Sequence, residues 1–406
     1  MIQREHYLKK IRPFIDSGLI KVVTGIRRSG KSMLLAQVQK ELLAAGRTAD
    51  QFIRLNFEQL QYEALTDYHR LNDYLVNEIE KRPGEKVYLF LDEIQEVDQF
   101  QKVINSLRVN YEERLDIYVT GSNAKLLSGE LATLLGGRYI NITVYPFSFA
   151  EYKQVQLVAD SDEKLFEHYL ETGGMPFLTT NQFELVEEVA YLNDVYNSIV
   201  LKDIVQRDKI RDADLLQRLL TYIISNIGRT FSARSLVNYL KNEGIATSTT
   251  TIMNYLTNST EAYIILPLKR FDIQGKKVLS TQEKYYVVDH GFREAVTARN
   301  ARDIELILEN IVLVELLKRG YQVSVGKFGD LEVDFVAEKN GANGLERVYI
   351  QVSYILATPE TRMREFAPLL KIDDNYPKMV LTLDPLTSSE AGIEHVKLQD
   401  WLLSDD

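Results

Sequence analysis

Hydrophobic and polar positions along the first 150 residues predict strands and helices in alternation. Short, mainly apolar runs of four to six residues predict buried parallel strands at 20–24, 52–57, 87–91, 117–120 and 140–144. The amphipathic run 33–43 predicts a helix directly after the first strand. Strands that alternate with helices in this way are typical of a doubly wound parallel sheet, so we expect an α/β fold.

The remaining residues change pattern three times, which predicts further domains. Residues 151–228 are helical almost throughout, with an interruption at Gly173-Gly174-Met175-Pro176. Two short helices, at 232–240 and 248–256, then precede a hairpin whose strands 264–271 and 277–279 pair across Gly275. From 303 we expect a long helix over 304–319, three strands, a helix and a last strand at 378–383. The predicted domains are therefore 1–150, 151–228, 229–300 and 301–406.

Composition narrows the class of protein. The chain of 406 residues is 45% hydrophobic and 26% charged, as expected for a soluble globular protein. No apolar run approaches the ~20 residues that cross a bilayer, and the first residues lack an apolar signal core. The absence of cysteine excludes disulfides, thiolate zinc sites and cysteine nucleophiles, and five histidines offer little for a metal cluster. We expect a cytoplasmic protein with no membrane partner.

A phosphate-binding loop lies between the first predicted strand and the helix after it. Its eight residues are Gly25, Ile26, Arg27, Arg28, Ser29, Gly30, Lys31 and Ser32. The glycines let the backbone N–H groups turn inward around an anion, and the helix N-terminus adds partial positive charge. Lys31 is expected to reach the β- and γ-phosphates, and the Ser32 hydroxyl to bind Mg²⁺. The motif predicts that the protein binds a nucleoside triphosphate.

Two carboxylates follow the predicted strand 87–91. Asp92 can hold the Mg²⁺-bound water shell, and Glu93 can polarise the water that attacks the γ-phosphate. An Asp-Glu pair at a strand end is common, but the loop upstream supplies the rest of the same site. The sequence therefore favours hydrolysis over binding alone.

In the order of these parts the chain resembles the AAA+ superfamily of ATPases. The resemblance implies ATP and Mg²⁺ as cofactors and a sensor residue near the γ-phosphate at Ser122, with Thr120 as the alternative. The next helix closes at Gly136-Gly137-Arg138-Tyr139, where AAA+ proteins often place an arginine that reaches a neighbouring subunit's nucleotide in a homo-oligomer. A structural salt bridge or an intramolecular phosphate contact are the alternatives for Arg138.

More closely, the whole chain looks like the bacterial and archaeal ATPases that carry an uncharacterised C-terminal domain. The residues that carry this resemblance are the loop 25–32, Thr120-Gly121-Ser122 and Pro146-Phe147-Ser148-Phe149. The resemblance implies an AAA+ core followed by a helical lid over 151–228.

The segment 229–300 looks like a winged-helix domain, with two short helices and a hairpin as its wing. It has ten Lys and Arg against six Asp and Glu, whereas the whole chain carries a net charge of −10. The predicted recognition helix has no Lys or Arg, and the cations gather on and after the hairpin at Lys269, Arg270, Lys276, Lys277 and Lys284. This layout suits contacts to DNA phosphates more than base readout. Roles as a lid or in protein contacts stay open.

The last hundred residues resemble the PD-(D/E)xK nuclease fold. Glu309 on the predicted helix and Asp334 on a following strand match the first two acidic positions. Gln351 and Ser353 stand where active members have a carboxylate and a lysine. Lys339 or Arg364 could substitute for that lysine. We expect this domain to be an inactive, nuclease-like module that engages a partner protein or nucleic acid.

The leading interpretation is an ATP-binding and ATP-hydrolysing AAA+ switch that engages a DNA or protein partner. An ATP-dependent DNA nuclease is one alternative, and a nucleotide-gated DNA-binding regulator with negligible turnover is the other.

Overall fold

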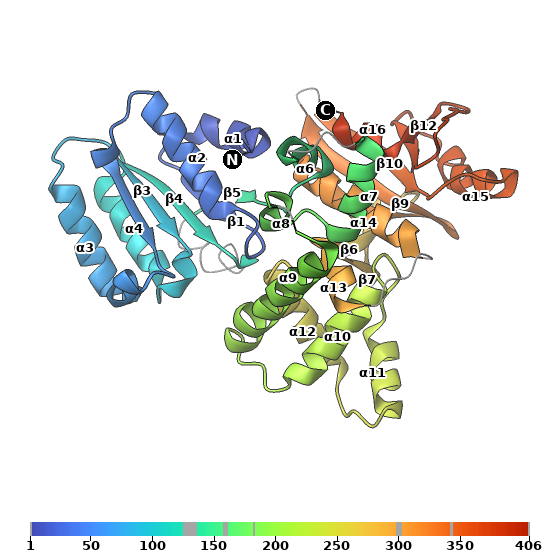
Figure 1. The fold of residues 1–406 in the computed structure, drawn as a ribbon, viewed down its shortest axis with the longest axis horizontal. Coiled ribbons are helices and arrows are strands. Elements are labelled where there is room, and N and C mark those ends of the chain that lie inside the picture. The colour runs from blue at the N-terminus through green and yellow to red at the C-terminus, as the bar shows by residue number, and fades with distance from the viewer. Residues whose placement is uncertain are drawn as a thin grey trace. The chain divides into compact units, whose positions relative to one another are not determined.

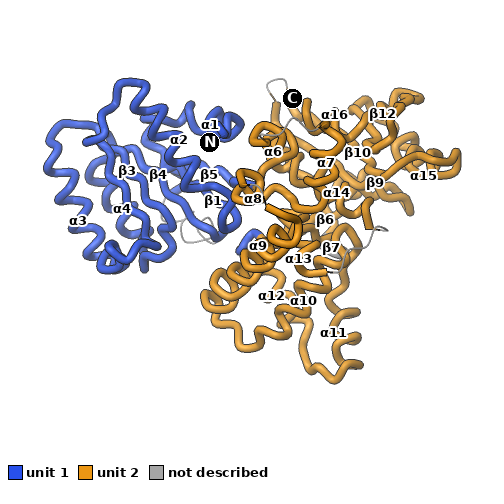
Figure 2. Tube along the Cα trace, in the orientation of Figure 1, with its two compact units in different colours: residues 1–145, 261–263 blue, residues 146–260, 264–406 orange. Residues whose placement is uncertain are grey.

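The chain folds into two compact units. A computed structural model describes residues 2–124, 136–156, 161–181, 183–297, 303–341 and 344–404. The first unit comprises Met1–Tyr145 and Glu261–Tyr263, and the second comprises Pro146–Thr260 and Ile264–Asp406 (Figure 2). Within the described ranges, no helix combines the length and the apolar character that crossing a bilayer requires.

The first unit is a parallel sheet covered by helices on both faces (Figure 1). Its strands lie in the order β2-β3-β4-β1-β5. Their bounds are β1 Ile20–Thr24, β2 Phe52–Asn56, β3 Val87–Asp92, β4 Leu115–Gly121 and β5 Tyr139–Thr143. The helices are α1 Glu5–Ile11, α2 Lys31–Ala44, α3 Tyr68–Glu80 and α4 Phe100–Tyr111. All five predicted strands and the predicted helix after the first strand are confirmed.

Alternate residues of the buried strands face the two helical layers. Leu89 and Leu91 of β3 pack with the apolar side of α3 and α4, whereas Tyr88 and Phe90 pack with α1 and α2. Every residue of β3 and β4 is buried, which explains why these strands are apolar without alternation. The doubly wound α/β fold is therefore confirmed, and the order of the strands brings the carboxyl ends of β1, β3 and β4 together.

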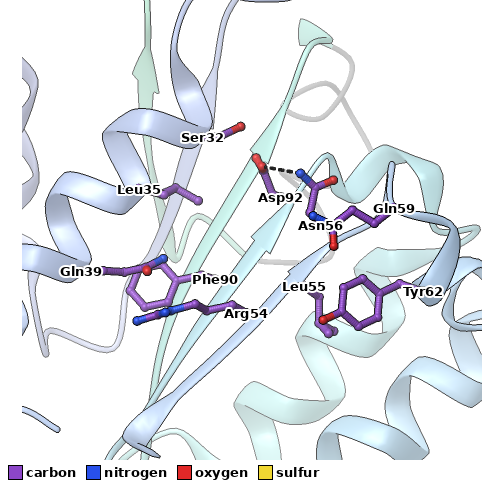
Figure 3. Close-up of a pocket in the computed structure, with 10 residues that line it drawn as sticks. All are labelled: Ser32, Leu35, Gln39, Arg54, Leu55, Asn56, Gln59, Tyr62, Phe90 and Asp92. Carbon is purple, nitrogen blue, oxygen red and sulfur yellow. Dashed lines mark hydrogen bonds between the residues drawn. The ribbon is translucent and has the colours of Figure 1, made fainter. Parts of the chain in front are cut away.

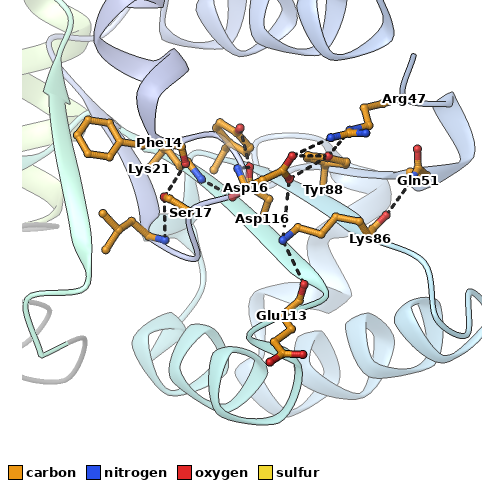
Figure 4. Close-up of polar contacts among 12 residues, drawn as sticks. Phe14, Asp16, Ser17, Lys21, Arg47, Gln51, Lys86, Tyr88, Glu113 and Asp116 are labelled. Carbon is orange, nitrogen blue, oxygen red and sulfur yellow. Dashed lines mark hydrogen bonds and ion pairs between the residues drawn. The ribbon is translucent and has the colours of Figure 1, made fainter. Parts of the chain in front are cut away.

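One charged pair lies inside this sheet, at the amino ends of its strands (Figure 4). The side chains of Lys21 and Asp116 are both 0% exposed, and the Lys21 ammonium donates to the Asp116 carboxylate. The Tyr118 hydroxyl donates to the other oxygen of Asp116 at 2.8 Å, and the backbone N–H of Asp16 at 3.3 Å. Burial lowers the pKa of Lys21 and raises that of Asp116, and their mutual attraction opposes both shifts.

The second unit joins a helical segment to a seven-stranded sheet of order β12-β11-β10-β9-β8-β6-β7. Its first helices are α6 Phe149–Val155, α7 Asp162–Thr172, α8 Pro176–Thr179, α9 Leu185–Ser198, α10 Ala213–Ser225, α11 Ala233–Asn242 and α12 Thr249–Glu261. The later helices are α13 Gly291–Val296, α14 Ile304–Lys318, α15 Pro359–Leu370 and α16 Leu398–Leu403. The strands are β6 Ile265–Asp272, β7 Lys277–Val287, β8 Gln322–Phe328, β9 Leu331–Gly341, β10 Gly344–Val352, β11 Lys378–Thr382 and β12 Ile393–Lys397.

The hairpin predicted as a wing is part of this larger sheet. β6 and β7 pair antiparallel, with Asp272 opposite Lys277, which confirms the hairpin. β6 also pairs parallel with β8, with Arg270 opposite Val325, so one sheet runs across the predicted boundary at residue 300. The sequence missed the extension of β7 to Val287, as well as β12 and α16. The division into four domains and the winged-helix assignment stay predictions.

The interruption at Gly173-Gly174 is a site of close packing within the second unit. Gly173 has a φ of +72°, and a Cβ there would lie 1.9 Å from the Asp289 carboxylate. The other oxygen of Asp289 accepts a hydrogen bond from the Gly174 N–H at 2.9 Å. A side chain has no room at this point, which explains why the helical pattern stops there.

Candidate nucleotide-binding site

The phosphate-binding loop connects β1 to α2 at the carboxyl edge of the sheet. Gly25 has a φ of +138°, and a Cβ there would lie 2.2 Å from the Val144 carbonyl oxygen, so only glycine fits. Gly30 adopts the left-handed conformation at φ +95° and caps α2, which begins at Lys31. The loop therefore ends at a helix N-terminus, the setting that an anion-binding loop requires.

The other loop residues differ in exposure. Ile26 and Ser29 are buried, and the Ser29 N–H donates to the Ile26 carbonyl at 3.2 Å. Arg28 is exposed, and Arg27 forms an ion pair with Glu58 at 2.7 Å. The buried pair shapes the loop, while the two arginines lie at its rim.

Lys31 is buried and held inside the site by weak partners. Its ammonium donates to the carbonyls of Gly25 and Ile26 at 3.2 and 3.1 Å, and lies 3.5 Å from the Glu93 carboxylate. The structure thus brings the predicted phosphate lysine and the predicted base side by side. None of these contacts is short, so an anion in the loop can replace them.

Thr120, on the neighbouring strand β4, contacts both acidic residues of the site. The Thr120 hydroxyl donates to the Asp92 carboxylate and accepts from the Glu93 N–H at 2.9 Å. Glu93 has a left-handed backbone at φ +53°, which turns its side chain toward Lys31 rather than along the strand. Gln95 donates to the second Glu93 oxygen at 2.5 Å.

Asp92 lies in a setting that favours a cation. Burial raises the pKa of Asp92, and hydrogen bonds from Thr120 and Ser32 oppose that shift. A cation beside a buried carboxylate offsets the cost of its burial. Ser32 and Asp92 are thus the residues of this site that could hold Mg²⁺, and the hydroxyl and carboxylate oxygens they offer suit that ion.

A cavity of about 240 Å³ opens beside these two residues (Figure 3). Ser32 and Asp92 line it, and the Asn56 amide lies next to Asp92 and donates to it at 3.1 Å. The remaining lining comes from α2, β2, β3 and the segment after β2: Leu35, Gln39, Arg54, Leu55, Gln59, Tyr62 and Phe90. A cavity therefore adjoins the predicted Mg²⁺ site.

The two sensor candidates lie near each other but differ in contacts. Ser122 is buried directly after β4, the strand between β3 and β1. Thr120, the alternative, contacts the Asp92 carboxylate and the Glu93 backbone N–H. The sensor role of either residue stays a prediction, and these contacts favour Thr120 as a positioning group.

Arg138 lies away from the nucleotide loop. Its carbonyl accepts from the Ile20 N–H at 3.1 Å, at the start of β1, and its guanidinium lies 3.6 Å from Glu112 at an exposed position. The length of β1 puts it about 13 Å along the sheet from the loop. This placement disfavours an intramolecular phosphate contact, and the salt bridge is present but exposed and weak. The role of Arg138 stays a prediction. The helix predicted before Gly136 lies outside the described residues.

Three residues that position groups of the site were not predicted from the sequence. The buried Arg4 guanidinium donates to the carbonyls of Ser29 and Tyr145, each at 3.0 Å, and so ties the N-terminal segment to the loop. No spacing signal identifies Arg4. Asn56 and Gln95 were recognisable in principle, because Asn56 ends a strand next to β3 and Gln95 follows the acidic pair.

The cations predicted to contact DNA fall into two groups, one exposed and one held in ion pairs. Lys269, Lys276 and Lys277 are exposed on the hairpin. Arg270 and Lys284 instead form ion pairs with the two oxygens of Glu332, at 2.8 and 2.7 Å. The structure thus removes two of the five cations from the predicted phosphate-contacting surface.

The nuclease-like residues do come together in the second unit. The Val352 N–H donates to Asp334 at 2.9 Å, and Gln351 accepts from the Asp334 N–H at 3.3 Å. Ser353 is buried beside them. The two candidate replacement cations have partners of their own: Lys339 lies 3.6 Å from Glu346, and Arg364 lies 2.7 Å from Glu365.

Comparison with known proteins agrees with the loop and its sheet. Residues 17–153 match the family described as AAA domain, and residues 163–305 match a domain of unknown function. An uncharacterised protein of Haemophilus influenzae is 39% identical over 99% of both chains. The chain belongs to the AAA+ family. The domain of unknown function follows the AAA domain, as the resemblance to this type of protein implied.

More distant proteins add little about this AAA+ protein. An uncharacterised protein of Methanocaldococcus jannaschii is 28% identical, over 94% of this chain and 85% of its own. The AMPPCP-bound DnaA of Aquifex aeolicus is 14% identical, with a TM-score of 0.32, over 63% of this chain and 86% of its own. A TM-score this low carries no argument about fold or function.

Proposed function

We propose that this AAA+ protein binds ATP with Mg²⁺ and hydrolyses it, and that the cycle switches its engagement of a DNA or protein partner. The observation that carries the proposal is the convergence of Lys31, Asp92 and Glu93 at the carboxyl edge of one sheet, where Thr120 contacts the Asp92 carboxylate and the Glu93 backbone N–H. Bound Mg²⁺ would neutralise phosphate charge between Ser32 and Asp92.

The contact between Lys31 and Glu93 suggests how binding prepares hydrolysis. The Lys31 ammonium lies 3.5 Å from the Glu93 carboxylate. A phosphate group draws Lys31 toward the loop, which leaves one Glu93 oxygen free to accept a proton from water while Gln95 holds the other. The base is thus released when the phosphate is in place.

The partner proposal rests on the exposed hairpin lysines. Lys269, Lys276 and Lys277 are exposed on one hairpin, which suits contacts to phosphates of DNA. A protein partner of the C-terminal region is the alternative. Nothing in the geometry favours nuclease activity as a second function, because Gln351 and Ser353 occupy the expected carboxylate and lysine positions.

ATP turnover and ATP affinity of Glu93→Gln test the proposal. An amide keeps the shape of the side chain but cannot take a proton, so we expect turnover to fall by roughly 10²- to 10⁴-fold with ATP affinity retained. Glu96→Gln, the same change at an exposed position of the same loop, is the matched control. Wild-type turnover in Glu93→Gln would refute the role of Glu93, and absence of ATP binding in the wild type would refute the proposal.

A further inference from the structure

An internal lysine lies among the acidic residues of the second unit. Lys284, on β7, is only 5% exposed, and its ammonium lies 2.7 Å from Glu332 on β9. The other Glu332 oxygen accepts from Arg270 at 2.8 Å. Burial lowers the pKa of Lys284, but the charges of Glu309, Asp334 and Glu332 outweigh it and raise that pKa overall. Five charged side chains from β6, β7, β9 and α14 therefore form one cluster.

The carboxylates of this cluster also have protein donors. The Tyr286 hydroxyl donates to Glu309 at 3.0 Å, and the Val352 N–H donates to Asp334 at 2.9 Å. Gln351 holds the backbone of Asp334 and donates through its amide to Glu365 at 3.0 Å. The donors are thus already supplied from the surrounding strands, as a buried charged network requires.

The cluster already contains positive charge beside its carboxyls. Lys284 and Arg270 each bind one oxygen of Glu332. Burial raises the pKa of Glu309 to about 7 and raises that of Asp334 well above its usual range, and the charge of Lys284 opposes both shifts. A cation therefore acts on these carboxyls without an added ion.

These residues do not fit a divalent metal ion. The Lys284 ammonium contacts Glu332 and is attracted by Glu309 and Asp334, Gln351 offers an amide where an acidic ligand is needed, and Ser353 is not a lysine. In the parts of the chain that the structure describes, no group of three acidic or histidine side chains is arranged to hold a metal. The Lys284 ammonium would also repel a divalent ion placed beside it.

We propose that the Lys284 ammonium is the resident cation of the cluster formed by Glu309, Asp334, Glu332 and Arg270, in the place where the nuclease resemblance puts a metal. The cluster is therefore a lock that ties the hairpin to α14 and β9, and it is not a catalytic centre. This inference is independent of the proposed ATPase function, because it involves no residue of the nucleotide site.

Metal binding and thermal unfolding of the full chain test the lock. Lys284→Met removes the charge, Lys284→Arg keeps it, and Lys277→Met is the control at an exposed position of the same strand. Trp401, the one tryptophan of the chain, reports unfolding of the second unit by its fluorescence. Mn²⁺ binding is measured without nucleotide.

We expect Lys284→Met to lower the unfolding midpoint by at least about 6 °C, since it leaves buried carboxylates without their cation. Lys284→Arg and Lys277→Met should stay near the wild type. We expect no Mn²⁺ binding by the wild type that depends on Asp334.

Two results would overturn the inference. One is Mn²⁺ binding by the wild type that Asp334→Asn abolishes and Asp92→Asn leaves intact. The other is a Lys284→Met protein as stable as Lys277→Met. If Lys284→Met does not fold while Lys284→Arg does, the charge requirement is confirmed, and the Mn²⁺ measurement on the wild type still decides the question of the metal.

Discussion

Lys31 and Lys284 each lie beside acidic side chains, but the two settings differ in how firmly the lysine is held. Lys31 has two backbone carbonyls at 3.1 and 3.2 Å and Glu93 at 3.5 Å, beside an open cavity. Lys284 has Glu332 at 2.7 Å, and the carboxylates around it are satisfied by protein donors. Partners at longer distances leave a lysine able to exchange them for a ligand, whereas a close ion pair among carboxylates that already have donors makes it part of the scaffold.

Lys21 is the most completely buried and most firmly paired of these lysines. It is fully buried with Asp116 between strands of the first unit, and Tyr118 completes the shell of the carboxylate. The three lysines thus form a series from exchangeable to locked. A lysine beside Asp or Glu can belong to a ligand-binding site or to a structural ion pair. The distances to all of its partners distinguish the two cases.

The largest expected effect comes from removing Lys31, the lysine whose partners a ligand can replace. Lys31→Ala removes the buried cation of the loop, so ATP affinity should fall by at least about 100-fold, as expected for a charge-assisted contact to phosphate. Because the contacts of Lys31 are weak, the unfolding midpoint should shift by less than about 2 °C. ATP titration and thermal unfolding check both. A large loss of stability would place Lys31 with Lys284 among the locked lysines.

The next effect tests whether the open site is completed by a second copy of the chain. If Arg138 acts in trans, Arg138→Ala should leave ATP affinity near normal and lower turnover at least tenfold. Mixing it with Lys31→Ala should then restore part of the activity, because one mixed interface keeps both groups. Turnover of each variant alone is the control. Mixtures no better than the separate proteins, despite confirmed co-assembly, would contradict a shared site.

The locked cluster should reveal itself in the pH dependence of stability. Burial raises the pKa of Glu309 from 4.5 to about 7, opposed by Lys284 and the Tyr286 hydroxyl and reinforced by Glu332 and Glu305. The folded state therefore keeps a proton that the unfolded state has lost between about pH 4.5 and 7. Stability should fall as pH rises through that window, by up to about 1.4 kcal/mol per pH unit, and level off above it.

Glu309→Gln removes part of that slope, since Asp334 retains its own raised pKa in the same direction. Denaturant unfolding followed by Trp401 fluorescence at pH 5, 6, 7 and 8 measures the difference. Glu394→Gln, at an exposed position of β12 in the same unit, is the control and should follow the wild type. Parallel curves for wild type and Glu309→Gln would show that Glu309 titrates as it does in the unfolded chain.

The smallest expected effect concerns the hairpin lysines that are exposed and do not belong to the Lys284 cluster. Replacing Lys269, Lys276 and Lys277 by Gln should lower the salt dependence of DNA binding by up to about 2.7 in the log–log slope, at roughly 0.9 per phosphate contact. The loss should be similar for unrelated DNA sequences. The charge-matched control replaces three exposed lysines of the first unit: Lys9, Lys40 and Lys102. If the wild type does not bind DNA at low salt, with or without ATP, DNA is not the partner, and a protein partner is the remaining proposal.

The sequence by itself determined the sheet of the first unit, the phosphate-binding loop and the two carboxylates after β3. These features follow from local rules: apolar runs form buried strands, a glycine-containing loop precedes a helix, and parallel strands present their carboxyl ends on one edge. Asp92 and Glu93 could therefore be placed near Lys31 without coordinates.

Only the tertiary structure decided which charged groups meet. The pairing of β6 with β8 brings Lys284 toward acids that are 25 to 50 residues away in the chain, and no local pattern encodes that pairing. The same holds for Arg4 at the loop and for Lys21 with Asp116, 95 residues apart. From sequence alone, a charged residue is predicted to be solvent-exposed. Its burial depends on a partner that a distant segment of the chain supplies, and the local sequence does not reveal that partner.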